Sequence, residues 1–406
     1  LLFSPHPRPD VVEQFLSGTH VLGQVSFQDL KAVLERKENA VMLDDQVEVN
    51  RKVCSMIDQL HSPQFGKHLC IISGPPGTGK TVVGLHILYA YCLKYGPSEQ
   101  NKGGGIFSLP RSRTLSQVIE GASGISPVYL NTVPPGRDLV VVDEAHRIEQ
   151  LDTTMTKLFQ KARMVVVLQD DRQRIRLTEE GTLERFQQFA KRHNIPCTTC
   201  FLASQKRSGY LGSYVFDLDQ LLYERREQPL ERLSALELRC WDDLNDLDKH
   251  LHQLAAAKRH VKWYAPLCWE WNHNRKKNDI VIRQASGTFE KPWNPANEQY
   301  AWYLGEKSRD LDRVGCIYTA QGLEFDDIGV IWWDDLRWDA DAHNWRFEPS
   351  EDQFPTSIRK GPANQRDIEE LVLNTYRVLL TRAKSSVHIW FRDHATQEHV
   401  RQVLDF

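Results

Sequence analysis

The sequence contains no apolar run approaching the roughly 18 residues that a membrane-spanning helix needs. It also shows no internal repeat and no low-complexity tract. The chain begins with Leu1-Leu-Phe-Ser-Pro5, without Met and without the basic-then-apolar pattern of a secretory leader. We therefore expect a cytoplasmic protein with no membrane partner, and we interpret the 406 residues as a fragment of a longer chain.

Cysteine is sparse. Eight cysteines are scattered along the chain, and only Cys197 and Cys200 lie close together. Their C-x-x-C pattern lacks the second ligand pair of a zinc site and lies at the edge of an apolar stretch. Metal or redox use stays open as the alternative, but reduced thiols of a cytosolic protein are the favoured interpretation.

The chain has no strong excess of charge, since its formal net charge is −3. Nucleic-acid phosphates are bound by local Lys and Arg rather than by average charge, so this balance argues only against tight, non-specific wrapping of DNA. A content of 41% hydrophobic and 26% charged residues is ordinary for a globular protein. The length exceeds one ordinary core and fits two domains.

Short continuous apolar runs bounded by polar turns are typical of strands in a buried parallel sheet. Helical patterns lie between several of them, for example over 368–380, so we predict an α/β fold with parallel sheets. The runs occur at 68–72, 139–142, 164–168, 261–264, 314–318, 328–332 and 387–390.

The two halves of the chain differ in chemistry, because all eleven tryptophans lie between Trp241 and Trp390. We place a domain boundary near residue 200. The predicted organisation is an N-terminal helical extension over 1–40, a first domain over 41–200 and a second domain over 201–406.

The stretch GPPGTGKT matches the pattern GxxxxGK[ST], with an apolar run before it and a helical pattern after it. The N–H groups of such a loop close around the β-phosphate of a nucleotide, and the helix N-terminus adds its dipole. Lys80 is expected to reach the β- and γ-phosphates, and Thr81 is expected to ligate Mg²⁺. The predicted nucleotide-binding residues of the loop are Gly74, Pro75, Pro76, Gly77, Thr78, Gly79, Lys80 and Thr81.

The stretch DLVVVDEAHRI supplies the acidic strand end that such a loop requires. Asp143 is the candidate Mg²⁺ partner, and Glu144 is the candidate general base for the attacking water. His146 either links the nucleotide and polymer sites or is simply a helix-start residue. Both motifs together predict ATP binding with Mg²⁺ and ATP hydrolysis.

The loop alone does not distinguish a small-molecule kinase, a protein-remodelling ATPase and a nucleic-acid motor. The spelling GPPGTGKT is common in ring-forming remodelling ATPases, which continue with a sensor strand that ends in Asn. Here the next apolar run ends in Asp170-Asp-Arg-Gln173. This D-x-x-Q ending resembles motif III of superfamily 1 helicases, in which the Gln senses the γ-phosphate. Gln169 stands where that family usually has Gly.

Two further positions of the first half fit the same resemblance. Gln46 stands where such helicases keep the Gln that reads adenine, although a solvated helix residue is nearly as good an interpretation. Arg111 and Arg113 occupy the place of motif Ia, whose strand and loop lie along the polymer. They are either phosphate contacts or part of an exposed basic loop.

Three stretches of the second half resemble the motifs that complete the nucleotide site of these helicases across a cleft. Arg207 follows Ser204-Gln-Lys and resembles the arginine of motif IV, which points at the γ-phosphate. The stretch YTAQGLEFDDIGVIW resembles motif V, in which Gly322 permits a close backbone approach and Glu324 binds the ribose. The stretch NTYRVLLTRAKSSVHIW resembles motif VI, with Arg382 as the second γ-phosphate arginine.

The stretches Trp269-Glu-Trp271, Pro292-Trp-Asn294 and QGLEF, together with the motif VI sequence, resemble the Schlafen-type helicase domain of bacterial proteins. The resemblance covers roughly residues 40–400 and implies two RecA-like domains with ATP between them. There are two departures. Cys316 stands where motif V usually has Thr. The segment 113–138 is short, so we expect the extra subdomain that many helicases insert there to be absent or minimal.

We therefore predict an ATP-dependent, helicase-like motor that acts on DNA or RNA, in single-stranded form, with defence against foreign nucleic acid as the implied setting. The alternative is a nucleotide-gated switch that controls a partner or an attached nuclease outside this fragment, without unwinding. The tryptophans of the second half either stack bases or fill its core. The basic stretch Arg275-Lys-Lys277 is either a polymer contact or a solvated turn.

Overall fold

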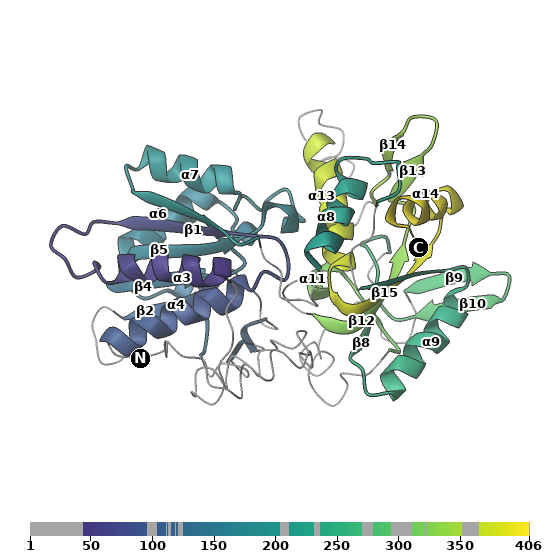
Figure 1. Ribbon diagram of the computed structural model, residues 1–406, viewed down its shortest axis with the longest axis horizontal. Helices are drawn as coiled ribbons and strands as arrows, with labels where there is room; N and C mark the ends of the chain where they lie inside the picture. The colour runs from purple at the N-terminus through teal and green to yellow at the C-terminus, as the bar shows by residue number, and fades with distance from the viewer. Residues whose placement is uncertain are drawn as a thin grey trace.

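Two parallel β-sheets form the framework of the protein, one in each half of the sequence (Figure 1). Among the described residues, no helix combines the length and the apolar character that a membrane span requires. This computed structural model describes residues 44–95, 104–110, 112, 115–117, 119–120, 125–203, 211–230, 236–269, 279–293, 311–320, 322, 324–350 and 365–405.

The sheet of the first half has six strands in the order β3-β2-β4-β5-β1-β6, and all its neighbours are parallel. Residues that alternate along β1 and β5 face opposite sides, so Ile72 and Val166 pack with α3 and α4, whereas Ile71 and Val165 pack with α6 and α7. The strands are β1 (His68–Ser73), β2 (Gly105–Leu109), β3 (Val128–Tyr129), β4 (Arg137–Val142), β5 (Ala162–Gln169) and β6 (Cys197–Phe201). The helices are α3 (Asp44–Ile57), α4 (Lys80–Tyr95), α6 (Leu151–Lys161) and α7 (Leu183–Arg192).

The sheet of the second half has five parallel strands in the order β11-β8-β12-β15-β7. One face packs on α8, α13 and α14, and the other packs on α9. The strands are β7 (Glu237–Trp241), β8 (Val261–Tyr264), β11 (Val314–Gly315), β12 (Phe325–Trp332) and β15 (Ala383–Phe391). The helices are α8 (Leu211–Leu222), α9 (Leu244–Ala256), α11 (Ile317–Ala320), α13 (Gln365–Leu380) and α14 (His394–Leu404).

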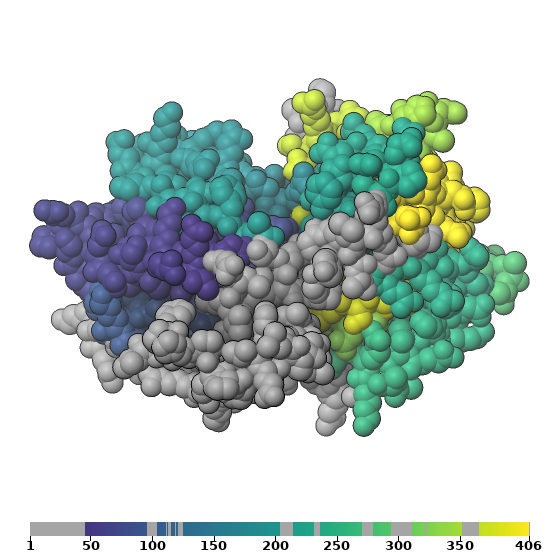
Figure 2. Space-filling model, in the orientation of Figure 1, coloured from purple at the N-terminus to yellow at the C-terminus, as the bar shows by residue number. Residues whose placement is uncertain are grey.

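Two antiparallel hairpins extend the second half. The strands β9 (Ile280–Gln284) and β10 (Gly287–Lys291) form one, and β13 (Leu336–Asp339) and β14 (Asn344–Phe347) form the other. In the space-filling view the two halves adjoin, and the visible face is hollowed between α7 of the first half and α8 of the second (Figure 2).

The predicted α/β class with parallel sheets is confirmed by this topology. The prediction of a strand over 314–318 is wrong beyond its first two residues, because a helix follows at once. The Thr319 hydroxyl accepts a hydrogen bond from the Cys316 N–H at 2.9 Å and donates to the Cys316 carbonyl at 2.8 Å, which closes the first turn of α11.

The tryptophans of the second half mainly fill its core. Trp293, Trp332 and Trp338 are buried, and Trp269 and Trp333 pack half-buried against the cluster around α9. The core interpretation is therefore confirmed for these residues. Trp271 of the quoted motif lies outside the described residues, as does the predicted N-terminal extension.

Candidate active site

The loop between β1 and α4 has the backbone conformation that its glycines predict. Gly77 and Gly79 have φ angles of 83° and 77°, which glycine adopts without strain. A Cβ atom on Gly79 would lie 2.7 Å from Gln46 Nε2, and one on Gly74 would lie 2.7 Å from the Leu202 carbonyl oxygen. The loop therefore has no room for side chains where α3 and the end of β6 contact it.

Lys80 is the first residue of α4, and its side chain turns back into this loop. The Lys80 Nζ donates hydrogen bonds to the carbonyls of Gly74 at 2.6 Å and Pro75 at 3.1 Å. Burial lowers the pKa of Lys80, and the carboxylates of Asp170 and Glu144 oppose this shift. The ammonium group of Lys80 thus lies inside the loop, next to the position where the backbone N–H groups of the loop would bind phosphate.

Asp143 follows the end of β4 and is joined to the start of α4. The Thr81 hydroxyl donates to Asp143 Oδ2 at 2.7 Å, and Asp143 Oδ1 accepts from the Glu144 N–H at 2.9 Å. Burial and the neighbouring Glu144 raise the pKa of Asp143, so a cation here would stabilise its ionised form. Two oxygen donors from adjacent strand and helix ends suit Mg²⁺.

Glu144 occupies a left-handed backbone position, with φ 51°, two residues after the end of β4. Its Oε2 lies 3.2 Å from Nε2 of His146, which is 1% exposed. Burial would raise the pKa of Glu144, but His146, Arg147 and Lys80 lower it to about 2. Glu144 is therefore ionised, as a general base must be, and His146 lies beside it in the site.

Gln46 is wholly buried beneath the loop. Its Nε2 donates to the Thr78 carbonyl at 2.7 Å, and the neighbouring Asp45 carboxylate accepts from the Ala203 N–H at 2.9 Å. The first turn of α3 therefore braces the nucleotide loop and the end of β6. The structure places Gln46 in the site, but with its amide N–H on the backbone of the loop.

Gln173 and Asp170 lie together just after β5. The Gln173 Nε2 donates to Asp170 Oδ2 at 3.0 Å, and Gln173 is 4% exposed. Burial would raise the pKa of Asp170, but Arg377 and Lys80 lower it to about 2. Asp170 is therefore ionised, and it lies between Lys80 of the nucleotide loop and Arg377 of the second half.

Gly322 brings the backbone of the second half close to Glu144 of the first half. It has φ 77°, and a Cβ atom on it would lie 3.1 Å from Leu115 Cδ1 and 3.7 Å from Glu144 Oε1. Glu324, two residues later, is exposed just before β12. The close approach that the sequence predicts at Gly322 is therefore an approach to Glu144.

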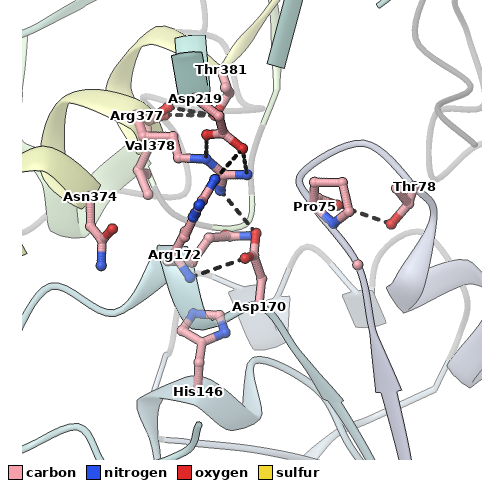
Figure 3. A network of polar contacts seen from close by, with 12 residues as sticks. Pro75, Thr78, His146, Asp170, Arg172, Asp219, Asn374, Arg377, Val378 and Thr381 are labelled. Atoms are coloured by element: carbon pink, nitrogen blue, oxygen red, sulfur yellow. Dashed lines mark hydrogen bonds and ion pairs between the residues drawn. The ribbon is translucent and has the colours of Figure 1, made fainter. Parts of the chain in front are cut away.

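Arg377 of α13 joins the two halves (Figure 3). Its Nη1 lies 3.1 Å from Asp170 Oδ2, its Nε lies 2.7 Å from Asp219 Oδ1, and the whole residue is 2% exposed. Asp219 lies on α8 and also pairs with Arg172 Nη1 at 2.6 Å. Two carboxylates and two arginines from both halves thus form one buried to half-buried network next to the nucleotide loop.

The arginine predicted from motif VI, Arg382, lies in the turn that follows α13. The Arg382 Nε donates to the Val378 carbonyl at 2.9 Å, and Nη2 donates to the Thr381 hydroxyl at 3.2 Å, so these bonds cap the end of α13. Arg207, Arg111, Arg113 and the 275–277 stretch lie outside the described residues.

The sequence interpretation missed Arg377, Asp170 as its partner, and Asp219. The signal was present, because Arg377 stands in the middle of the apolar helical pattern YRVLL. A charged residue on such a helix is rarely buried unless it is paired. Its distant partners, by contrast, could be identified only from the fold.

Residues 67–393 match the family model described as Schlafen group 3, DNA/RNA helicase domain. An uncharacterized protein of Saccharomyces cerevisiae is 20% identical over 423 residues, which cover 90% of this chain and 92% of that relative. The resemblance to Schlafen-type helicase domains that the motifs indicate is thereby confirmed.

Among solved structures, the PRRSV helicase is 14% identical, with a TM-score of 0.38 over 86% of this chain and 56% of that one. Arterivirus nonstructural protein 10 (helicase), solved with DNA, is 12% identical, with a TM-score of 0.37 over 86% and 65%. A structure of two coordinating Pif1 helicases at forked dsDNA is 13% identical, with a TM-score of 0.33 over 72% and 86%. The chain thus spans 56% and 65% of the first two of these helicase chains.

Proposed function

The chain belongs to the family of the Schlafen group 3 DNA/RNA helicase domain, and from this premise we propose that it is an ATPase that couples hydrolysis to movement on, or remodelling of, a DNA or RNA strand. One observation carries the proposal. Glu144 and Asp170, which lie beside the nucleotide loop of the first half, meet Gly322 and Arg377 of the second half. A change in the nucleotide would therefore act on both halves at once.

Each group of the first half has a chemical role in this proposal. Lys80 exchanges the carbonyls of Gly74 and Pro75 for the β- and γ-phosphates. Thr81 and Asp143 hold Mg²⁺, which when bound neutralises charge on the phosphate oxygens. Glu144 takes a proton from the attacking water.

The resemblance assigns the γ-phosphate to Gln173, adenine to Gln46 and the ribose to Glu324. These three assignments rest on the resemblance.

Arg377 is the arginine of the second half that geometry places beside the first half. Its guanidinium is planar and always charged, so it can exchange the Asp170 carboxylate for γ-phosphate oxygens without changing its charge. Arg382 and Arg207 stay as the arginines that the resemblance assigns to the same phosphate. Single-stranded DNA or RNA is the proposed polymer, with Arg111, Arg113 and the 275–277 stretch as proposed phosphate contacts.

A nucleotide-gated switch without unwinding is the second candidate, and one observation favours it. Cys316 stands at the motif V position that usually carries Thr, and it is fully buried, with its backbone bonded to Thr319. A side chain enclosed in this way does not contact a polymer. In this second candidate the nucleotide controls a partner or a nuclease outside the fragment.

The experiment that tests the proposal is ATP turnover by the purified protein, with and without single-stranded DNA or RNA. We expect turnover that Lys80→Ala abolishes and that a single strand raises by about an order of magnitude or more, as transition-state groups become ordered. Turnover that no strand changes would support the switch. No turnover at all, with ATP still bound, would overturn the assignment of an ATPase.

A further inference from the structure

The segment of residues 170–181 joins β5 to α7 within the first half, but part of it packs on the second half. Ile175 is 5% exposed and lies in the hydrophobic cluster that also holds Leu218 and Tyr376. Leu177 packs against the same cluster, and the short helix η3 (Asp171–Gln173) packs against α13. An apolar side chain that follows the motif III strand is therefore part of the core of the other half.

Polar contacts attach the same segment to the motif V and motif VI elements. Asn374 Nδ2 of α13 donates to the Arg174 carbonyl at 2.9 Å. The Arg176 guanidinium lies 4.3 Å from the ring centre of Tyr318 in α11, within the range of a cation–π contact. The segment thus contacts both second-half helices that precede the strands β12 and β15.

Glu179 closes the segment into a compact loop. Its Oε2 accepts hydrogen bonds from the N–H groups of Ile175 at 2.7 Å and Arg176 at 3.2 Å. Its backbone carbonyl accepts from Arg174 Nε at 2.8 Å. Because Glu179 is only 3% exposed, these bonds are shielded from water, and residues 174–179 are held as one unit.

The other end of the segment contacts the turn that follows Glu144, the proposed general base. A Cβ atom on Gly181 would lie 2.0 Å from the Ala145 carbonyl oxygen, so the two backbones are in direct contact. The Glu180 N–H donates to the Ile148 carbonyl at 2.8 Å. A displacement of the segment would therefore displace the residues that follow Glu144.

We propose that segment 170–181 is the element that couples the catalytic turn at Glu144 to the second half, with Ile175 as its positioning residue. The inference rests on the proposed function and specifies how it works. Closely packed groups move as a unit rather than deforming gradually, so a shift of the second half changes the position of the 144–148 turn. Ile175 holds the segment in position on the second half, because its side chain is buried in the core of that half.

The test compares Ile175→Ala with Ile389→Ala. Ile389 is 1% exposed, belongs to the same cluster and lies on β15, so its truncation makes the same change to the same core without touching the segment. We expect Ile175→Ala to keep strand-free ATP turnover within about twofold and to lower the stimulation by a single strand at least about fivefold, a size typical of changes along a coupling path.

Ile389→Ala is expected to lower Tm at least as much as Ile175→Ala does, but to keep the stimulation by a single strand. Ile175→Leu is expected to recover the stimulation that Ile175→Ala loses. Equal losses of stimulation in both alanine variants, or none in Ile175→Ala, would overturn the proposal.

Hydrogen exchange tests the same inference without any nucleic acid. In the Glu144→Gln protein, ATP is expected to slow amide exchange in α11 and α13. Adding Ile175→Ala is expected to abolish this slowing, whereas adding Ile389→Ala is expected to keep it. If a strand does not stimulate the parent protein, the motor function fails, and this comparison alone decides whether the segment couples the halves. Slowing that survives Ile175→Ala would refute the coupling role.

Discussion

Arg377 shows at the scale of one residue how the two halves meet. A guanidinium that is buried among the apolar side chains of a helix is stable only with charged partners. Here the partners are Asp170 from the first half and Asp219 from the second. The phosphate loop was predictable from the sequence, because its residues follow a fixed pattern. The partners of Arg377 were not, because no local sequence feature states which carboxylate a buried arginine will contact.

Lys80 and Glu144 are predicted to fail in different ways. Lys80→Ala removes a phosphate ligand, so ATP binding and hydrolysis should both fall. Glu144→Gln keeps the shape of the side chain but cannot take a proton, so it should retain ATP while losing turnover by about 100-fold or more. Equilibrium binding of a fluorescent ATP analogue beside steady-state turnover separates the two. Equal loss of nucleotide binding in both variants would contradict these roles.

Gln46 is predicted to support the loop more than to read the base. Its Nε2 is already bonded to the Thr78 carbonyl, and the residue has no exposed surface. Gln46→Ala should therefore lower turnover of ATP, GTP, CTP and UTP by similar factors, together with Tm. The measurement is kcat/KM for the four nucleotides in parent and variant. If the parent strongly prefers ATP and the variant loses this preference, the result would support adenine recognition by Gln46 instead.

At the scale of elements, the long apolar strands and the helix α13 were predictable, because burial on both sides imposes an unbroken apolar run. The five-residue strands β6 and β7 were not, since CTTCF and ELRCW carry polar residues on sheet edges. The hairpins β9–β10 and β13–β14 were missed for a related reason. Their pairing depends on a partner strand, and an alternating exposed face has no continuous apolar signal.

Asp335 joins the end of β12 to α13, and its protonation should affect the stability of this junction. Burial raises the pKa of Asp335 to about 6, even though hydrogen bonds from Tyr376 and Cys268 favour the ionised form. The folded state thus holds the proton more tightly than the unfolded state, whose ordinary value is 3.8. Its contribution to stability is therefore complete below about pH 4 and is lost as pH rises through about 6.

Asp335→Asn should remove this pH dependence, because the amide stays neutral and still accepts from Tyr376. At pH 8 the variant should be more stable than the parent by on the order of 2 kcal/mol, and at pH 4 the two should be similar. Urea unfolding at the two pH values measures the difference. The same pH profile in both proteins would show that the buried carboxyl does not control it.

At the scale of the whole molecule, two parallel-sheet units form one site only through groups that cross between them. Arg377 reaches Asp170, Gly322 approaches Glu144, and Ile175 enters the core of the second half. The sequence indicated both units and the order of the motifs. The sequence could not indicate these three contacts, because each depends on how the surfaces of the two halves fit together.

The most direct test of a shared site is the rate of ATP hydrolysis by Arg377→Lys. Lysine keeps the positive charge for Asp170 and Asp219, which limits unfolding, but it lacks the planar fork that binds phosphate oxygens in pairs. An interaction made in the transition state appears in kcat more than in KM. We expect a kcat at least about tenfold lower, which corresponds to roughly 1.4 kcal/mol of barrier, with a smaller change in KM. A kcat within about twofold of the parent, in a variant of unchanged Tm, would contradict a site completed by both halves.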